Sequence, residues 1–283
     1  METVEIVEVG PRDGLQNEPR LVPLQEKLAL IDLLSTVGFR RIEAASFVSA
    51  RRVPQMADAT AVMAGIVRVP GVRYAALAPN RQGAEVAIAA RCDEIAVFAS
   101  ASEGFSRANL NCSVDESVAR FGPVAELARA AGIPLRGYVS CATDCPFDGA
   151  VAPERVARVA AMLRDLGCHE VSLADTLGRA HPEAVDAMLA SVLEELPPGQ
   201  LAAHFHDTGG GALANIDVAL ARGLRVFDAA VGGLGGCPFA PGAPGNVATE
   251  AVHDHLVAAG YATGLNRDIL LQASGMARAL RIG

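Results

Sequence analysis

Residues 201–208 read Leu-Ala-Ala-His-Phe-His-Asp-Thr, and they show the pattern that decides the fold. A short apolar run, typical of a strand buried on both faces, passes directly into polar residues and glycines. His204 and His206 are two residues apart. Because strand side chains alternate between two faces, both imidazoles should point the same way. Two such histidines at the end of a strand suit a divalent metal, although a pair of hydrogen-bonded core histidines is the simpler interpretation.

Short apolar segments of this kind recur along the chain, and segments with helical spacing separate them. Leu28, Ile31 and Leu34 mark one such helix, which should end at Gly38 because glycine favours the position just after a helix. The expected strands are residues 4–9, 41–45, 72–77, 94–99, 134–140, 170–174, 201–206 and 225–231. The expected helices are residues 25–37, 55–65, 80–90, 113–131, 153–167, 182–196, 212–222 and 246–259, and a last helix covers about 266–281.

Strands that alternate with helices predict an α/β fold with a parallel sheet and right-handed crossovers. The length of 283 residues favours one closed (β/α)8 (TIM) barrel, typically about 250 residues, with one or two extra C-terminal helices. We therefore expect a single catalytic domain over residues 1–283. An open doubly wound sheet is the alternative. However, the turn after the first strand, residues 10–14 (Gly-Pro-Arg-Asp-Gly), lacks the G-x-G-x-x-G spacing of its phosphate loop.

The segments around the fourth helix have a clear local pattern. Residues 100–112 are mostly polar and should form a loop. Ser113 and Glu116 have the spacing of a capping box, in which each side chain accepts a backbone N–H at the start of a helix. That helix should continue to residue 131. Near the end of the chain, the glycine-rich stretch 232–245 should be a loop before the helix over 246–259.

The composition argues against several classes of protein. A net charge of −8 without a run of basic residues argues against a nucleic-acid partner. No apolar stretch approaches the ~20 residues that span a membrane, and Met1-Glu2-Thr3 leads straight into a strand without a secretory signal. The six cysteines are scattered through a large chain, which favours reduced thiols in a cytoplasmic protein over a disulfide scaffold.

In a (β/α)8 barrel the chemistry lies at the carboxyl ends of the strands, and several polar residues fall there. Asp13 offers a carboxylate and Asn246 offers an amide oxygen. Together with the imidazoles of His204 and His206 they form a mixed oxygen and nitrogen set. Such a set, with no thiolate, suits Mg²⁺ or Mn²⁺ with positions left open for a substrate. The other interpretations are a turn-forming role for Asp13 and a helix cap for Asn246.

Four further residues near these strand ends have side chains suited to catalysis. Arg12 carries a fixed charge that suits an oxygen becoming negative during a reaction, although it could simply pair with Asp13. Glu43 lies in an apolar strand, so its carboxylate needs a partner such as Arg12. Asp175 could shuttle a proton or cap its own turn. Cys237 lies in the glycine-rich stretch, where it could serve as an acid or be incidental.

Six stretches of the chain resemble sequences of one known family. They are residues 9–18 (Val-Gly-Pro-Arg-Asp-Gly-Leu-Gln-Asn-Glu), 42–49 (Ile-Glu-Ala-Ala-Ser-Phe-Val-Ser), 53–56 (Val-Pro-Gln-Met), 136–141 (Arg-Gly-Tyr-Val-Ser-Cys), 204–208 (His-Phe-His-Asp-Thr) and 233–239 (Gly-Leu-Gly-Gly-Cys-Pro-Phe). The family is that of the 3-hydroxy-3-methylglutaryl-CoA lyases, and the resemblance runs from about residue 4 to 275. The last stretch is specific to these lyases within a wider superfamily of metal-dependent barrels, which also holds isopropylmalate and homocitrate synthases and 4-hydroxy-2-oxovalerate aldolases.

The resemblance implies cleavage of 3-hydroxy-3-methylglutaryl-CoA to acetyl-CoA and acetoacetate, a step of leucine breakdown. The metal ligands that it implies are Asp13, His204, His206 and Asn246. The functional groups that it implies are Arg12, at the thioester oxygen, and Glu43, Asp175 and Cys237. We expect His204 to be catalytic as well, as a proton-transfer group. The substrate contacts that we expect are Arg12, Gln16, Ser46 and Asn109. The family commonly dimerises, so we also expect a homodimer.

Three alternatives stay open at this point. Gly209 and Gly211 stand where we expect Tyr and Gln in relatives, so larger 3-hydroxy-3-alkylglutaryl thioesters are an alternative class of substrate. A Claisen-type synthase of the same superfamily would share the metal-binding face. A catalytically silent metal- or acyl-CoA-binding barrel would be marked by the loss of Arg12 or Asp13, and both are present.

Overall fold

Eight parallel strands close a barrel in the computed structural model, which describes residues 1–237 and 240–282, the side chains of residues 236–237, 240–244 and 282 excepted. Neighbouring strands follow the chain order, and β10 returns to pair with β1 and close the ring. The prediction of a (β/α)8 barrel is confirmed. The strands of the barrel are β1 (Glu5–Glu8), β2 (Arg41–Ser46), β3 (Arg73–Leu77), β4 (Glu94–Ser100), β5 (Leu135–Ser140), β8 (Glu170–Asp175), β9 (Leu201–Phe205) and β10 (Val226–Ala229).

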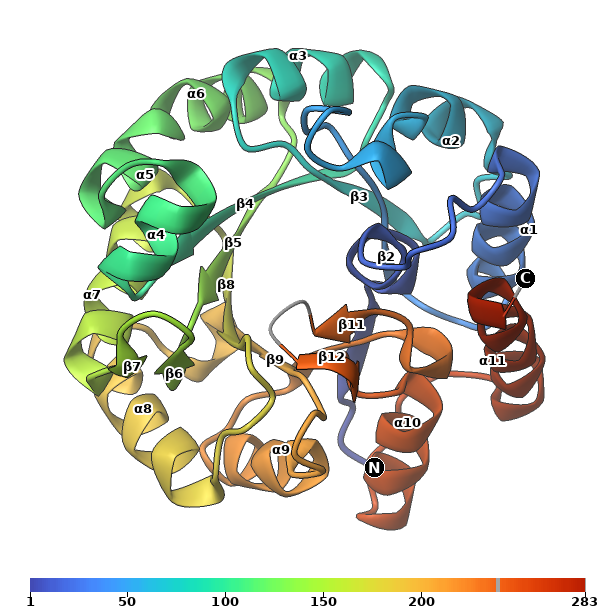
Figure 1. Ribbon diagram of the computed structural model, residues 1–283. Helices are drawn as coiled ribbons and strands as arrows, with labels where there is room; N and C mark the ends of the chain where they lie inside the picture. Colours follow the sequence, from blue (N-terminus) through green and yellow to red (C-terminus); the bar gives the residue numbers. More distant parts are fainter. Residues whose placement is uncertain (238–239, 283) are drawn as a thin grey trace.

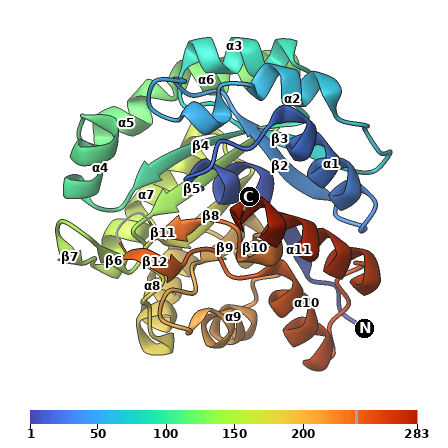
Figure 2. The same ribbon diagram turned by 45° about the vertical axis from the view of Figure 1, so that its right-hand side comes forward.

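Helices surround the barrel on its outside (Figure 1). The eighth strand is followed by α10, and α11 is one additional helix that lies beside α1 and α10 (Figures 1 and 2). The helices are α1 (Leu24–Ser35), α2 (Ala59–Gly65), α3 (Arg81–Ala89), α4 (Glu103–Leu110), α5 (Val114–Arg120), α6 (Gly122–Ala131), α7 (Pro153–Leu166), α8 (Pro182–Glu195), α9 (Ala212–Ala221), α10 (Thr249–Ala258) and α11 (Arg267–Ile282). No helix within the described residues is both long and apolar enough to span a membrane.

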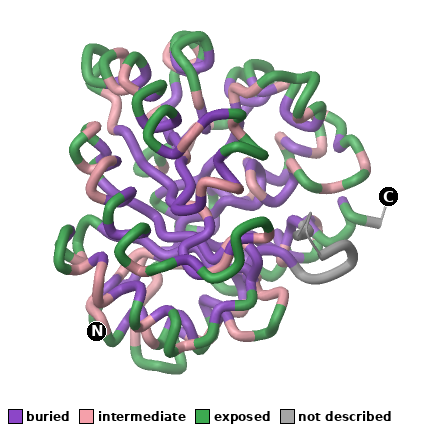
Figure 3. The backbone as a smooth tube through the Cα atoms, turned by 60° about the vertical axis from the view of Figure 1, so that its left-hand side comes forward, coloured by how far each residue is buried: buried purple, intermediate pink, exposed green. Residues whose placement is uncertain are grey.

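The strands are apolar because they are covered on both sides. Every residue of β2, β8 and β9 is buried, while the outward sides of the helices are exposed (Figure 3). These parallel strands have helices on one side and the filled barrel interior on the other, so neither face is exposed to water. Their sequences are therefore mostly apolar and do not alternate between polar and apolar residues. This is why the short runs in the sequence marked the strands correctly.

The interior of the barrel is charged as well as apolar. Arg41 and Arg136 are each 1% exposed, and both bind Glu170 through guanidinium–carboxylate contacts of 2.8 and 2.7 Å. Arg136 also binds Asp228 at 2.8 Å. Buried ions must be paired and hydrogen-bonded to be tolerated, and these contacts meet that requirement. A chain of ion pairs therefore crosses the interior from Glu5, which binds Arg41 at 2.8 Å, to Asp228 near the opposite end.

Two predictions between β4 and β5 were wrong. Residues 103–110 form α4 rather than a loop, because the Ser102 hydroxyl caps the helix by accepting the Phe105 N–H at 3.1 Å. The helix predicted from 113 to 131 is broken into α5 and α6 around Gly122. Pro123 has no N–H with which to continue α5. The capping box of Ser113 with Glu116 is confirmed.

Four further features differ from the prediction. The second helix begins as a 3-10 turn over Pro54–Met56 and becomes α2 only at Ala59. The glycine-rich stretch 232–245 contains a hairpin of β11 (Gly236–Cys237) and β12 (Ala240–Pro244). A second short hairpin pairs β6 (Asp144–Cys145) with β7 (Gly149–Ala150). The next helix, α10, starts at Thr249 and not at 246, because residue 246 is held in a β-bridge with residue 206.

Candidate active site

The first part of the site is the turn that follows β1. Gly10–Gly14 form one turn of π-helix, which carries Arg12 and Asp13. The buried carboxylate of Glu8 fixes this turn by accepting the N–H groups of Gly10 and Val231, at 2.8 and 2.9 Å. A Cβ at Gly10 would lie 2.6 Å from Glu8 Oε1, so this position requires glycine for the close approach. The turn therefore has a defined position over the end of the barrel.

Arg12 is held between two carboxylates. Its Nε donates to Glu43 Oε2 at 2.7 Å, its Nη2 lies 2.6 Å from the same oxygen, and its Nη1 lies 2.6 Å from Asp13 Oδ1. Burial alone would lower the pKa of Arg12, but the charges of Glu43 and Asp13 more than reverse this, so the pKa is raised. Arg12 therefore carries a permanent positive charge. Glu43 Oε1 is buried and has no hydrogen-bond partner among the described residues.

Asp13 lies directly beside the two histidines at the end of β9. Asp13 Oδ2 is 3.8 Å from His204 Nε2 and 4.0 Å from His206 Nε2. One ligand atom of each of these three residues can be chosen so that all lie within 4.8 Å of one another. The prediction that both imidazoles point to the same side is thus confirmed, and they point at the turn after β1.

The electrostatics of this cluster put Asp13 and His206 in forms that can bind a cation. Burial would lower the pKa of His204, but the nearby carboxylates of Asp228 and Asp13 outweigh burial and raise this pKa. Burial would raise the pKa of Asp13, but the charges of Arg12 and the histidines lower it to about 2. Burial and the neighbouring His204 lower the pKa of His206 to about 4, so this imidazole is neutral near pH 7. An ionised carboxylate and a neutral imidazole are the forms in which these side chains bind a metal.

Asn246 reaches the site through backbone pairing. Residue 246 forms a β-bridge with residue 206, while the N–H of Asp207 donates to Gly245 O at 2.7 Å. Asn246 Nδ2 donates to Asp13 Oδ2 at 2.9 Å and to Leu234 O at 3.2 Å. The amide therefore presents its nitrogen to Asp13, and a half-turn of the amide would present the oxygen instead. Asn246 does not cap α10, whose N-cap is Ala248.

These residues fit a divalent metal by the chemistry of their donors. The carboxylate and two imidazoles offer hard oxygen and borderline nitrogen ligands without a thiolate, which suits Mg²⁺ or Mn²⁺. Ligand atoms around an octahedral ion with bonds of about 2.1 Å are separated by roughly 3.0 Å when adjacent and by roughly 4.2 Å when opposite. The separations of 3.8 and 4.0 Å from Asp13 Oδ2 lie between these values. Small side-chain movements would thus be enough to bring them onto one ion.

The other predicted site residues are in different places. Gln16 joins the cluster, because its Nε2 donates to Asp13 Oδ1 at 3.0 Å. Ser46, the last residue of β2, is completely buried, and its hydroxyl has no hydrogen-bond partner in the described part of the chain. Asn109 is exposed on α4, where its backbone carbonyl accepts from Arg52 at 3.3 Å. Cys237 belongs to β11, and its side chain lies outside the described residues.

Asp175 is engaged by its own loop. Its Oδ1 and Oδ2 accept the N–H groups of Gly178 and Ala180 at 3.0 and 2.9 Å. Burial raises its pKa, and these backbone hydrogen bonds offset only part of that effect. The turn-capping interpretation of Asp175 therefore describes its contacts. A carboxyl group with a raised pKa at the end of β8 is also suited to exchange a proton.

Sequence reasoning missed the residues that lie behind the site. Tyr138 on β5 has its ring under Arg12, whose guanidinium carbon is 5.6 Å from the ring centroid, and its hydroxyl is 3.3 Å from Glu43 Oε2. Asp228 on β10 is 3.3 Å from His204 Nδ1. The signal was available, because Arg136 and Asp228, like Glu43, are charged residues within apolar strands, and such charges need partners.

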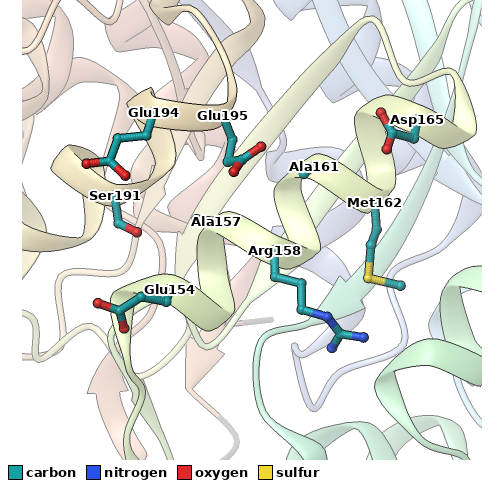
Figure 4. Close-up of a pocket in the computed structure, with 9 residues that line it drawn as sticks. All are labelled: Glu154, Ala157, Arg158, Ala161, Met162, Asp165, Ser191, Glu194 and Glu195. Carbon is teal, nitrogen blue, oxygen red and sulfur yellow. The ribbon is translucent and has the colours of Figure 1, made fainter.

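A shallow groove lies elsewhere, on the outside of the barrel between α7 and α8 (Figure 4). Acidic side chains dominate its polar lining, with Arg158 the one basic side chain among the residues that line it. The residues that line it are Glu154, Ala157, Arg158, Ala161, Met162, Asp165, Ser191, Glu194 and Glu195. None of them contributes to the cluster around Asp13, so the groove and the candidate metal centre are separate features.

Fold and site together define the class of this protein as a (β/α)8 barrel with a candidate divalent-metal centre at the carboxyl ends of its strands. Comparison with known proteins gives the family. Residues 3–276 match the family model described as HMGL-like. The chain is 56% identical over 263 residues to the cytoplasmic 3-hydroxy-3-methylglutaryl-CoA lyase of Danio rerio, an alignment that covers 93% of this chain and 78% of the relative.

Solved structures agree with the sequence comparison. The HMG-CoA lyase of Brucella melitensis is 58% identical, with a TM-score of 0.99 and full coverage of both chains. An HMG-CoA lyase from Acinetobacter baumannii, solved in complex with coenzyme A and 3-methylmalate, is 40% identical with a TM-score of 0.93, over 99% of this chain and 91% of that one. The chain therefore belongs to the 3-hydroxy-3-methylglutaryl-CoA lyase (HMGL-like) family.

Proposed function

We propose that this chain cleaves 3-hydroxy-3-methylglutaryl-CoA to acetyl-CoA and acetoacetate with the help of a divalent metal. The observation that carries the proposal is the position of Arg12. Its guanidinium is 2.6 Å from Asp13, whose other oxygen faces His204 and His206. A fixed positive charge thus adjoins a candidate metal centre, at the end of a barrel where substrates bind. Family membership and the relative solved with coenzyme A support an acyl-CoA substrate.

The cleavage needs charge stabilisation at one oxygen. The proton of the C3 hydroxyl is removed, the C2–C3 bond breaks, and its electron pair passes into the thioester as an enolate. The C3 oxygen becomes the ketone of acetoacetate, and protonation of C2 gives acetyl-CoA. Arg12 would stabilise the enolate oxygen, since a preorganised cation in a buried site acts strongly on developing charge. Glu43 would hold Arg12 in place through the contacts of 2.6 and 2.7 Å.

The metal ligands that we propose are Asp13, His204, His206 and Asn246. A divalent ion held there would lower the pKa of a hydroxyl that ligates it and would orient the bond to be broken. The proposed base that takes the hydroxyl proton is either Asp175 or His204. Cys237 is proposed as an acid that protonates C2. Gln16, Ser46 and Asn109 are proposed as substrate contacts, of which Gln16 is best supported because it touches Asp13.

Several further properties are part of this proposal. Mg²⁺ or Mn²⁺ is the proposed metal, on the basis of the donor set. Residues 1–283 are proposed to act as one catalytic domain, because the candidate site combines residues from both ends of the chain. The name of the relative from Danio rerio supports a cytoplasmic location. The homodimer stays a prediction from the family resemblance. No nucleic acid and no membrane is proposed as a partner.

A coupled assay for acetoacetate tests the proposal. The purified protein is treated with EDTA, dialysed, and given 3-hydroxy-3-methylglutaryl-CoA with no metal, with Mg²⁺ or with Mn²⁺. We expect acetoacetate only after a metal is returned. Absence of acetoacetate under all three conditions, from a folded protein, would contradict the proposal.

The alternatives are tested in the same experiment. Larger 3-hydroxy-3-alkylglutaryl thioesters are run in parallel, and a Claisen-type synthase would show acetyl-CoA-dependent condensation with a 2-oxo acid instead of cleavage. The printed names of the relatives do not favour either alternative, because they are HMG-CoA lyases at 52–56% identity.

A further inference from the structure

We infer that Asp228 is a positioning residue that fixes the proton of His204 on Nδ1 and so directs the lone pair of Nε2 to the metal site. The inference rests on the proposed metal-dependent function, and it assigns a role to a residue whose contacts are with Arg136, Ser172 and His204.

Asp228 is a buried carboxylate with a fixed orientation. It is 2% exposed, and its Oδ1 accepts from Arg136 Nη2 at 2.8 Å. Its Oδ2 accepts from the hydroxyl of Ser172 at 2.8 Å and lies 3.3 Å from Arg136 Nη1. Asp228 therefore behaves as a permanent acceptor.

Arg136 is in turn fixed from its other side. Its Nε donates to Glu170 Oε1 at 2.7 Å, and Glu170 is also bound by Arg41 at 2.8 Å. This row of alternating charges runs through the barrel interior, where most (β/α)8 barrels have apolar side chains. It ends at Asp228. The row thus holds one carboxylate immediately behind the candidate metal centre.

His204 places one nitrogen on each side. Its Nε2 faces Asp13 Oδ2 at 3.8 Å, while its Nδ1 is 3.3 Å from Asp228 Oδ2. Nδ1 is buried and makes no well-aligned hydrogen bond within the described residues, so Asp228 is the acceptor available to it. Asp228 and His204 are also register partners on neighbouring strands β10 and β9, which places their side chains on the same face of the sheet. The backbone itself therefore brings the two groups together.

The chemistry of metal-binding histidines explains the arrangement. A neutral imidazole carries one proton, and the nitrogen without the proton is the one that can bind a metal. A carboxylate that accepts the proton on the other nitrogen fixes the tautomer and the orientation of the ring. If Nδ1 carries the proton that faces Asp228, and Nε2 would bind the metal, neither ring nitrogen of His204 has a free lone pair. His204 could then not accept the proton of a substrate hydroxyl. Of the two proposed bases, this leaves Asp175.

The first test uses the unmodified protein without metal. Long-range ¹H–¹⁵N correlation spectra of histidine-labelled protein report which ring nitrogen carries the proton, and a His204→Gln sample identifies the His204 signals. We expect the proton on Nδ1 of His204 at pH values where the ring is neutral. A proton on Nε2 would overturn the inference. This measurement needs no change at Asp228, so it decides the question even if a variant there does not fold.

The second test is Asp228→Asn, which keeps the size of the side chain. The amide oxygen should face Arg136, which offers only donors, and this leaves the amide N–H₂ facing His204. An N–H donor at that position requires a lone pair on Nδ1, so the proton should move to Nε2. We expect the Kd for Mn²⁺, measured by calorimetric titration, to rise about 10–100-fold. This is the typical cost of losing a hydrogen-bond partner of a metal ligand. Affinity within twofold of the unmodified protein would overturn the inference.

A matched control is Asp186→Asn, which removes a carboxylate bound to Arg222 at 2.6 and 2.7 Å on the outside of the barrel. It should leave the Mn²⁺ affinity and the His204 tautomer unchanged. Both readouts are independent of lyase activity. A protein that makes no acetoacetate would overturn the proposed function without affecting the tautomer result, and an active enzyme with the proton on Nε2 would overturn the role of Asp228 alone.

Discussion

Arg12 and Arg41 are two buried arginines at opposite ends of the same barrel. Arg41 is the first residue of β2, and it meets Glu5 and Glu170, the first residues of β1 and β8, at 2.8 Å each. Arg12 lies beyond the end of β1 and meets Glu43 and Asp13 at 2.6 Å each. Both guanidinium groups are thus paired with two carboxylates, and both are at most 5% exposed.

The two ends of the barrel differ in the kind of buried group that has no hydrogen-bond partner. Arg41 and Arg136 together occupy both oxygens of Glu170, and a third carboxylate, Glu94, lies 3.8 Å from Arg41 with both of its oxygens buried and without a hydrogen bond in the described part of the chain. At the other end Glu43 Oε1 and the Ser46 hydroxyl have no partner in the described part of the chain, and Asp13 faces two imidazoles. At the amino end of the barrel, fixed charges are paired mainly with one another. Unused ligands at the carboxyl end mark the place for a substrate and a cation.

Arg41→Gln should produce the largest effect. It leaves Glu5 without its cation and leaves the buried Glu170 with Arg136 alone, and breaking a buried pair typically costs about 3–5 kcal/mol. We expect the free energy of unfolding in urea to fall by this amount. A loss below about 1 kcal/mol would show that the amino end does not depend on its ion pairs.

Arg12→Gln should act on the rate rather than on the fold. Removing a preorganised cation at a developing negative charge typically lowers kcat by about 10²–10³. Glu43 can take up a proton when its partner is lost, because burial already raises its pKa, so the stability should fall less than in Arg41→Gln. The measurement is the steady-state rate of acetoacetate formation together with Mn²⁺ binding, which should persist. A near-normal kcat would remove Arg12 from the mechanism.

Acid should destabilise the protein through its amino end. The charges of Arg136 and Arg41, acting against burial, lower the pKa of Glu170 from 4.5 to about 2. Between these pH values the side chain of Glu170 binds a proton in the unfolded chain but not in the folded chain. Its contribution to the free energy of unfolding is therefore complete above about pH 5 and is lost as the pH falls toward 2. The expected loss is about 3 kcal/mol. Urea unfolding at a series of pH values measures it, and Arg41→Gln should show a weaker dependence. A flat profile would contradict this assignment.

His206→Ala should weaken metal binding without a comparable effect on the fold. It removes one of the four proposed ligands. We expect the Mn²⁺ affinity to fall by at least about 100-fold, which is more than the usual cost of losing a hydrogen-bond partner of a metal ligand. Elemental analysis and calorimetry measure this. His255→Ala is the control, because His255 pairs with Asp217 on the surface at 2.7 Å. Unchanged metal content in His206→Ala would rule out its role as a ligand.

Arg81→Ala should have the smallest effect. Arg81 and Glu85 form an exposed pair four residues apart on α3, at 2.9 Å. Such pairs contribute at most about 0.5 kcal/mol, because water and salt screen them. Thermal or urea unfolding should barely change. A loss as large as that of Arg41→Gln would mean that burial is not what distinguishes these arginine pairs.

Much of the fold could be predicted because barrel strands are short, apolar and separated by amphipathic helices. The strand Leu201–Phe205 and its same-facing histidines followed from alternation alone. The predicted helix boundaries that were wrong depended on local hydrogen bonding. The Ser102 cap created a helix where polar residues suggested a loop, and Pro123 divided a helix that periodicity joined.

The sequence by itself determined the residue types of the site and the strand ends that carry them. Asp13, His204 and His206 could be grouped because barrel topology brings all strand ends to one rim. Only the tertiary structure decided the pairing of Arg12 with Glu43, the capping contacts of Asp175, and the position of Asp228 behind His204. Those contacts depend on strand register and side-chain direction across the barrel interior, which alternation along one strand does not specify.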